Sequence, residues 1–198
     1  MSNDFDNSFD FIFEQTYRMW KSDLEKIFRI GTKGTGGGCN LSSCILVLIG
    51  IESFAHCFSD KKTDAAAVED FVDAYFPDVY RGKMKKIYEL FRHGLAHNYF
   101  PKSESNLANT TRISFWVDIA GRVKSLSQYK RNLETYRKEA LKLSPPYKKP
   151  YVVVPQILFL DTVNVMEFLK DRVVTDESLQ KHFVKNCTRV RKTLRHIN

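Results

Sequence analysis

The sequence predicts a mainly α-helical protein with a small β insertion in its second half. Apolar residues recur at helical spacing through the first half, and glycines and prolines separate these stretches. β-branched and aromatic residues gather at 112–117 and 151–154, which is typical of short strands. The chain of 198 residues is long enough to bury a core without disulfides, so a single domain over 1–198 is expected.

We expect three consecutive parts within this domain. Residues 8–105 are predicted to form a helical core, residues 106–155 a mixed, basic insertion with the strands, and residues 156–198 the helices that complete a bundle. The first helix is predicted over 9–30, with Ser8 as its N-cap. Its expected buried stripe consists of Phe13, Tyr17, Trp20, Leu24, Ile27 and Phe28.

The glycine-rich segment 31–38 breaks this helix. It lacks the spacing of a phosphate-binding P-loop, so it is expected to be a connector. The most apolar stretch, 41–58, is predicted to be a buried helix. Gly50 and Glu52 interrupt it, and its longest apolar run, Cys44–Ile49, is far shorter than the roughly 20 residues of a membrane span.

Two more helices are expected before the insertion. One is predicted over 64–75 and ends at Pro77, and the next begins at about Val79 and stops before Pro101. The second of these carries an apolar stripe of Met84, Ile87, Tyr88, Phe91 and Leu95. The polar residues at its C-terminal end lie off that stripe, where departures from ideal helix geometry are common.

Charge is distributed unevenly within the net charge of +8. Residues 1–118 hold 14 Lys and Arg against 16 Asp and Glu, whereas residues 119–198 hold 17 against 7. This excess favours an acidic partner, most commonly nucleic acid, because bound cations release counterions from phosphates. The candidate RNA-binding residues are Lys124, Lys130, Arg131, Arg137 and Lys138, with Tyr129, Tyr136 and Tyr147 interleaved for base stacking. A solvated amphipathic helix is the alternative interpretation.

Cysteine usage and the N-terminal segment bear on the compartment. The four cysteines contain no CxxC pair, which argues against a zinc knuckle and a disulfide framework. The segment MSNDFDNSFDF is acidic and has no apolar core, unlike a secretory signal peptide. A cytoplasmic protein with reduced thiols is therefore expected.

The run RHGLAH, residues 92–97, carries most of the functional signal. RNA cleavage by internal transfer needs a base for the 2′-hydroxyl, an acid for the leaving 5′-oxygen and a cation for the phosphate. His97, His93 and Arg92 offer these groups, and the reaction needs no metal or cofactor. Residues five apart on an α-helix point about 140° away from each other. Arg92 and His97 therefore converge only at a distorted helix end or across a dimer, and we expect a homodimer.

With Arg92, four intervening residues and then His97, the chain resembles the HEPN domains, whose signature is Arg, four to six residues, then His. His93 is one of the polar residue types that the family favours after the arginine, and the helix order over 8–105 is similar to HEPN bundles. The resemblance implies a helical bundle that dimerises along the motif helix. It also implies a metal-independent endoribonuclease with Arg92, His93 and His97 as catalytic residues, and we expect a toxin or defence effector that cuts single-stranded or loop RNA.

Two further residues extend this interpretation. Asn98-Tyr99 is similar to the ending of HEPN toxins in toxin-antitoxin pairs, whose partner nucleotidyltransferase adenylylates the tyrosine, so Tyr99 is a candidate for regulatory modification. A ring that packs at a helix end is the alternative. A buried carboxylate must be paired or protonated, and we expect Glu52 to support the motif arginine, with a pairing to His56 or another basic group as the alternative. The expected partners are RNA, a second copy, and a cognate antitoxin or nucleotidyltransferase.

Two other functions fit the same residues. A non-catalytic HEPN-like module would use the groove that contains the motif residues to bind a nucleotide, a nucleic acid or a protein partner. This alternative stays open because a fold does not by itself define an activity. In a purely structural role, the motif residues would hold a dimer together or form a surface ion-pair cluster with Glu89.

Overall fold

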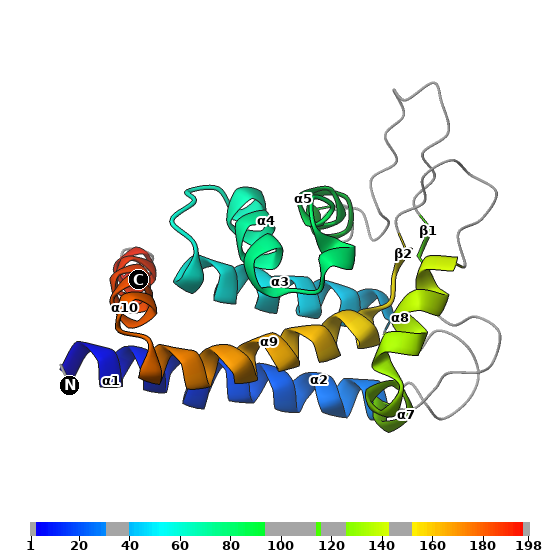
Figure 1. The fold of residues 1–198 in the computed structure, drawn as a ribbon, viewed down its shortest axis with the longest axis horizontal. Coiled ribbons are helices and arrows are strands. Elements are labelled where there is room, and N and C mark those ends of the chain that lie inside the picture. The colour runs from blue at the N-terminus through cyan, green and yellow to red at the C-terminus, as the bar shows by residue number, and fades with distance from the viewer. Residues whose placement is uncertain (1–2, 31–39, 94–113, 116–125, 143–151, 196–198) are drawn as a thin grey trace, which may run out of the picture. The chain divides into compact units, whose positions relative to one another are not determined.

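The computed structural model describes residues 3–30, 40–93, 114–115, 126–142 and 152–195 of the chain (Figure 1). These residues are mainly helical, which confirms the predicted fold class at this level. They belong to two compact units: Met1–Ser22, Ile49–Lys85 and Asp161–Asn198 contribute to unit 1, and Asp23–Leu48 and Lys86–Leu160 to unit 2. The division into a core, an insertion and completing helices stays a prediction.

The described part of the chain contains α-helical, π-helical and 3₁₀ elements. The α-helices are α1 (Asn3–Phe9), α2 (Arg18–Ile30), α3 (Asn40–Phe58), α4 (Asp64–Tyr75), α5 (Met84–Ile87), α7 (Leu126–Arg131), α8 (Leu133–Lys142), α9 (Pro155–Thr175) and α10 (Glu177–Arg195). Two segments, η1 (Asp10–Tyr17) and η3 (Tyr88–His93), are π-helical, and η2 (Asp78–Tyr80) is a 3₁₀ turn. The strands among the described residues are β1 (Ser114–Phe115) and β2 (Val152–Val153).

The first helical stretch starts earlier than predicted. It begins at Asn3, and Ser8 lies inside α1 with its side chain fully buried, so the predicted N-cap role of Ser8 is wrong. The reason is Phe5, whose buried ring adds one more apolar turn before the predicted start. The predicted stripe is confirmed: Phe13, Tyr17, Leu24 and Phe28 are buried, and Trp20 and Ile27 are half-buried.

The middle of this stretch departs from α-helix geometry. In η1 the Gln15 amide donates to Asp10 Oδ2 at 2.6 Å, and the Thr16 hydroxyl donates to the Phe11 carbonyl at 2.8 Å. Both contacts join residues five apart, which is the spacing of π-helical hydrogen bonds. Such segments are rare, and periodicity analysis at 3.6 residues per turn does not detect them.

The centre of unit 1 is a group of aromatic rings around Phe58 at the end of α3. The Phe58 ring stacks on Phe71 of α4 at a centroid distance of 5.9 Å and on Phe183 of α10 at 5.2 Å. Phe13 of η1 approaches both Phe58 and Phe183, at 6.4 Å and 5.7 Å. Figure 1 shows α4 crossing the second half of α3, and these ring contacts join four helical elements in one core.

Polar contacts within unit 1 tie the N-terminal helices to the C-terminal ones. Glu167 of α9 accepts hydrogen bonds from the Tyr17 hydroxyl and the Lys21 ammonium, both at 2.7 Å. Opposite charges attract in this pair, and the Lys21 contact helps to lower the pKa of Glu167 against the opposing effect of burial. Arg191 of α10 donates to the Asn7 carbonyl and lies over the Phe11 ring.

Gly50 marks a close approach between α3 and Trp20 of α2. A Cβ atom at position 50 would overlap the indole Nε1 and Cε2 atoms, and the ring packs edge-on against Phe54 at 5.4 Å. We therefore expect Gly50→Ala to lower the free energy of unfolding by about 1–3 kcal/mol, as overpacking of a close contact does. Urea unfolding followed by circular dichroism measures this, and the exposed Ser53→Ala on the same helix should change stability by less than about 0.5 kcal/mol. Equal stability of both variants would contradict the close packing.

The predicted helix from about Val79 is divided in the structure. A turn follows η2, with Gly82 at a φ of 65° and its N–H donating to Asp73 Oδ1 at 2.9 Å, and α5 begins at Met84. Glycine adopts this left-handed conformation without steric cost, which explains the late helix start. The apolar stripe is confirmed over the described residues, because Met84, Ile87, Tyr88 and Phe91 are all buried; Leu95 lies outside them.

Unit 2 has its own apolar interior. The Phe28 ring of α2 lies 5.3 Å from Phe159 of α9. Other buried residues of unit 2 include Leu24, Val47, Leu48, Ile87, Tyr88 and Phe91. β1 and β2 pair in parallel through Ser114 with Val152 and Phe115 with Val153. Most of 106–125 and 143–151 lies outside the described residues, so the small β insertion stays a prediction.

The predicted apolar helix over 41–58 corresponds to α3, and most of its apolar side chains are buried. Within the described part of the chain, no helix combines the length and the hydropathy needed to cross a membrane.

Candidate functional site

Arg92 and His93 lie in the π-helical segment η3, and His93 is the last residue that the structure describes in this part of the chain. Tyr88 and Phe91 bury their rings in unit 2, and Arg92 is half-buried beside them. The backbone of His93 is described as part of η3, while its side chain lies outside the described features. The segment that carries the motif arginine is therefore anchored by two aromatic side chains.

The π-helical segment η3 ends at His93, so it contains only the first two residues of the interval from Arg92 to His97. In an α-helix such residues point about 140° apart. In a π-helix the backbone bonds join residues i and i+5, so residues five apart follow each other by about one turn. The chain leaves α-helix geometry at Tyr88, four residues before Arg92. His97, Tyr99 and Lys124 lie outside the described residues, and the convergence of Arg92 with His97 stays a prediction.

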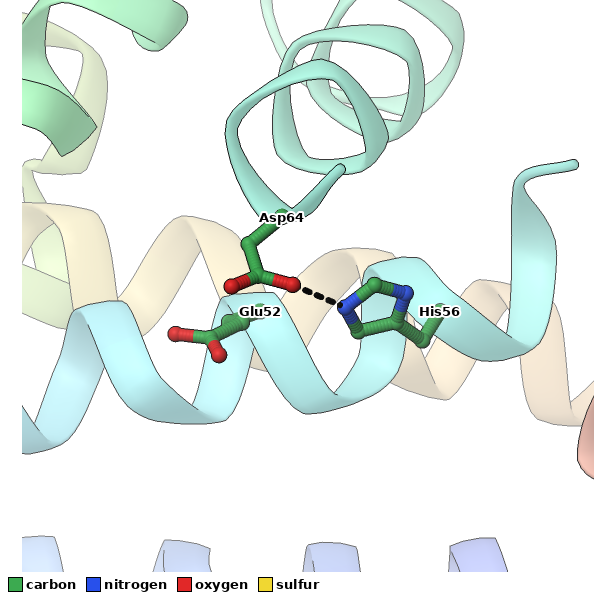
Figure 2. Close-up of side chains that lie close together, drawn as sticks. All are labelled: Glu52, His56 and Asp64. Atoms are coloured by element: carbon green, nitrogen blue, oxygen red, sulfur yellow. Dashed lines mark hydrogen bonds and ion pairs between the residues drawn. The ribbon is translucent and has the colours of Figure 1, made fainter. Parts of the chain in front are cut away.

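Glu52, the predicted support of the motif arginine, lies on α3 in unit 1 and is half-buried. Figure 2 shows its carboxylate together with the His56 imidazole, one turn further along α3, and the Asp64 carboxylate at the start of α4. His56 Nε2 and Asp64 Oδ1 are 3.0 Å apart, and one ligand atom from each of the three residues lies within 4.8 Å of the others. Support of Arg92 by Glu52 stays a prediction.

This three-residue cluster was only partly visible in the sequence. The spacing of four residues between Glu52 and His56 indicates one helix face. Asp64 joins them because the chain turns back between α3 and α4 over residues 59–63. Asp64 is the first residue of a predicted helix, and an acidic residue at that position is ordinarily explained by helix capping. The sequence therefore gave no sign of its contact with His56.

The predicted RNA-binding residues fall mainly on α7 and α8. Lys130 and Arg131 are exposed at the end of α7, which suits contacts to phosphates. Arg137 of α8 is half-buried and forms an ion pair with Glu134, and Lys138 belongs to the same helix. The Tyr129 ring is buried and packs edge-on against Tyr136 at 5.1 Å, so Tyr129 serves the core of unit 2 rather than base stacking.

The described cysteines are poor candidates for nucleophiles. Cys44, Cys57 and Cys187 are free thiols and all are buried. Burial raises the pKa of Cys44 to about 12, and a hydrogen bond with Cys57 together with burial raises the pKa of Cys187. The reactive form of cysteine is the thiolate, which these shifts disfavour.

Comparison of the chain with protein-family models, with curated proteins and with solved structures found no match. Its fold and its candidate residues must therefore carry the functional argument.

Proposed function

We propose that the protein is a HEPN-like, metal-independent endoribonuclease that acts on single-stranded or loop RNA. The observation that supports this most strongly is the π-helical segment η3, because it breaks α-helix geometry at the motif arginine. π-helical turns occur frequently at functional sites. Arg92 is half-buried and directly follows Phe91, whose ring is buried.

The proposed chemistry assigns one role to each polar residue of the motif. His97 removes the proton of the ribose 2′-hydroxyl, and the 2′-oxygen attacks the adjacent phosphorus. His93 protonates the 5′-oxygen as the P–O5′ bond breaks, which leaves a 2′,3′-cyclic phosphate and a 5′-hydroxyl. Arg92 stabilises the negative charge that builds on the phosphate, which suits a guanidinium with its fixed donor geometry.

The proposed site is composite and lies at the interface of a homodimer. A two-fold axis between the motif helices of two copies brings the same residues of both copies together. Each copy then supplies groups that the other copy cannot place alone. Lys130 and Arg131, exposed on α7, would add contacts to the RNA backbone. As a cytoplasmic toxin or defence effector, the protein would be restrained by an antitoxin or by modification of Tyr99.

An RNA-cleavage assay in EDTA with the full chain and its Arg92→Ala variant tests this function. The parent is expected to cut RNA, and Arg92→Ala to reduce the rate by at least about 100-fold, as loss of a charge-stabilising donor does. The exposed Arg81, which pairs with Asp78 at 2.8 Å, provides the matched control Arg81→Ala. That control should cut at the parental rate.

Circular dichroism establishes that each variant is folded before the rates are compared. Equal rates for Arg92→Ala and the parent would contradict the assignment. No cleavage by the folded parent would favour the non-catalytic module, and a salt titration of RNA affinity would then measure its phosphate contacts.

A further inference from the structure

We propose that Glu52, His56 and Asp64 form a binding site for one Zn²⁺ ion, separate from the ribonuclease motif. All three residues belong to unit 1, and two adjacent helices contribute them. Figure 2 shows the Glu52 and Asp64 carboxylates and the His56 ring gathered at the crossing of α3 and α4. The site offers two carboxylate oxygens and one imidazole nitrogen.

The spacing of the ligand atoms suits a small cation. In a tetrahedral zinc site with bonds of about 2.0–2.2 Å, ligand atoms lie about 3.3–3.6 Å apart. His56 Nε2 and Asp64 Oδ1 are already 3.0 Å apart, and the remaining pairs of ligand atoms are no more than 4.8 Å apart. Small side-chain rotations of Glu52 and Asp64 therefore suffice to bring all three atoms to bonding distance.

The donor set favours zinc over the common alkaline-earth ions. Mg²⁺ and Ca²⁺ prefer six or more oxygen ligands, whereas imidazole nitrogen is a typical ligand of Zn²⁺. Three protein ligands leave one tetrahedral position for water. The His56 side chain is 24% exposed and that of Asp64 54% exposed, so an ion can reach the site and keep a water ligand.

The backbone on the His56 side of the site is already fixed. Arg189 of α10 donates to the carbonyls of His56 at 3.2 Å and of Ser59 at 2.9 Å, which satisfies carbonyl groups at the end of α3. The Ser59 hydroxyl donates to Asp70 Oδ2 of α4 at 2.6 Å. These contacts hold the turn between α3 and α4, so the backbone that carries His56 and Asp64 is preorganised and only side chains need to adjust.

Electrostatics also favours a divalent cation at this position. Two carboxylates that share a site repel each other, and a cation bound between them removes the repulsion. Glu52 extends from a helix whose other side chains are mainly apolar, next to the Asp64 carboxylate. A zinc ion would therefore stabilise unit 1 by linking α3 to α4, with no part in RNA cleavage.

Isothermal titration calorimetry of the metal-stripped full chain with Zn²⁺ tests the site. We expect one ion per chain, with affinity reduced by about tenfold or more in Glu52→Gln and in His56→Gln, since even the loss of an outer partner of a metal site costs that much. Glu52→Gln keeps the size of the side chain and thus guards against misfolding. Thermal unfolding should show a rise in melting temperature with Zn²⁺ that both variants lose.

Two matched variants control for other sites. His182→Gln removes a half-buried histidine whose Nδ1 lies 3.7 Å from Asp60 Oδ2, and Glu69→Gln removes a half-buried carboxylate of α4. Both should bind zinc like the parent. All titrations are repeated with Cys39→Ser, because a thiolate is a strong zinc ligand.

Several outcomes would overturn the site. These are no binding by the parent, unchanged binding in Glu52→Gln and His56→Gln, or equal binding of Mg²⁺. The ribonuclease assay contains EDTA, so the zinc site and the ribonuclease activity succeed or fail separately.

Discussion

Replacing His97 with alanine is expected to abolish RNA cleavage while RNA affinity stays within about twofold of the parent. The proposed base acts only when the 2′-hydroxyl loses its proton, and general acid–base catalysis contributes typically about 10²–10⁴-fold to a rate. RNA binding, in contrast, depends mainly on cations that face the phosphates, such as Lys130 and Arg131 on α7. Single-turnover cleavage in EDTA and fluorescence anisotropy with the same RNA measure the two quantities.

His182→Gln provides the control for the loss of a histidine, because His182 lies in α10 and contacts the Phe58 carbonyl at 3.2 Å. It should leave both cleavage and affinity unchanged. A parallel loss of affinity and cleavage in His97→Ala would contradict a catalytic role and favour the binding module.

The proposed composite site leads to a second prediction that involves His97. An equal mixture of the Arg92→Ala and His97→Ala variants, unfolded and refolded together, should recover part of the parental activity. Mixed dimers contain one site with both residues intact if the two residues come from different copies. Absence of recovery in a mixture shown to contain mixed dimers would contradict the shared site.

The largest effect on stability is expected for Phe58→Ala in the aromatic core of unit 1. The Phe58 side chain is 4% exposed and its ring stacks on both Phe71 and Phe183. Truncation of such a ring leaves a cavity between α3, α4 and α10, and the expected loss of unfolding free energy is about 3–5 kcal/mol. Urea unfolding of the full chain, followed by circular dichroism, measures this loss.

The control is Phe168→Ala on α9, since the Phe168 side chain is 50% exposed. Its expected cost is below about 1 kcal/mol, because an exposed ring gains little from burial. Similar costs for Phe58→Ala and Phe168→Ala would show that Phe58 is not a central core residue.

The recurrence of apolar residues at helical spacing predicted most helices, because the side chains that recur in this way are the ones that the fold buries. The stripe on the first helical stretch and the one from Met84 to Phe91 are both buried in the structure. The helix over 64–75 is found as α4 with the predicted bounds, ahead of Pro77. Local propensities and burial act together in these segments, so the sequence alone is sufficient to locate them.

Other features depend on contacts that no local pattern contains. In the sequence, Gly50 indicates only an interruption of the apolar stretch. In the structure, the lack of a side chain at Gly50 leaves room for the Trp20 ring. The π-helical segments η1 and η3 arise from hydrogen bonds five residues apart, which a helical period of 3.6 does not encode. Asp64 reaches His56 only because α4 folds back over α3.

The residues of the RHGLAH motif, too, were only partly predictable from the sequence. The sequence predicts Arg92 near the C-terminal end of an amphipathic helix, and the structure adds the π-helical geometry of Tyr88–His93. The proposed dimer would depend on contacts between two chains, and His97 lies outside the described residues. The spacing of Arg92 and His97 does not by itself determine contacts between chains. The expectation of a dimer also came from the resemblance to HEPN domains.

Cleavage of a synthetic RNA in EDTA by the full chain, beside the same RNA with 2′-deoxy sugars, tests the ribonuclease assignment most directly. Internal transfer requires the 2′-oxygen as nucleophile. We expect the RNA to be cut to fragments with 2′,3′-cyclic phosphate ends and the 2′-deoxy strand to stay intact. Cutting of both strands at equal rates, or of neither by the folded protein, would contradict the proposed function.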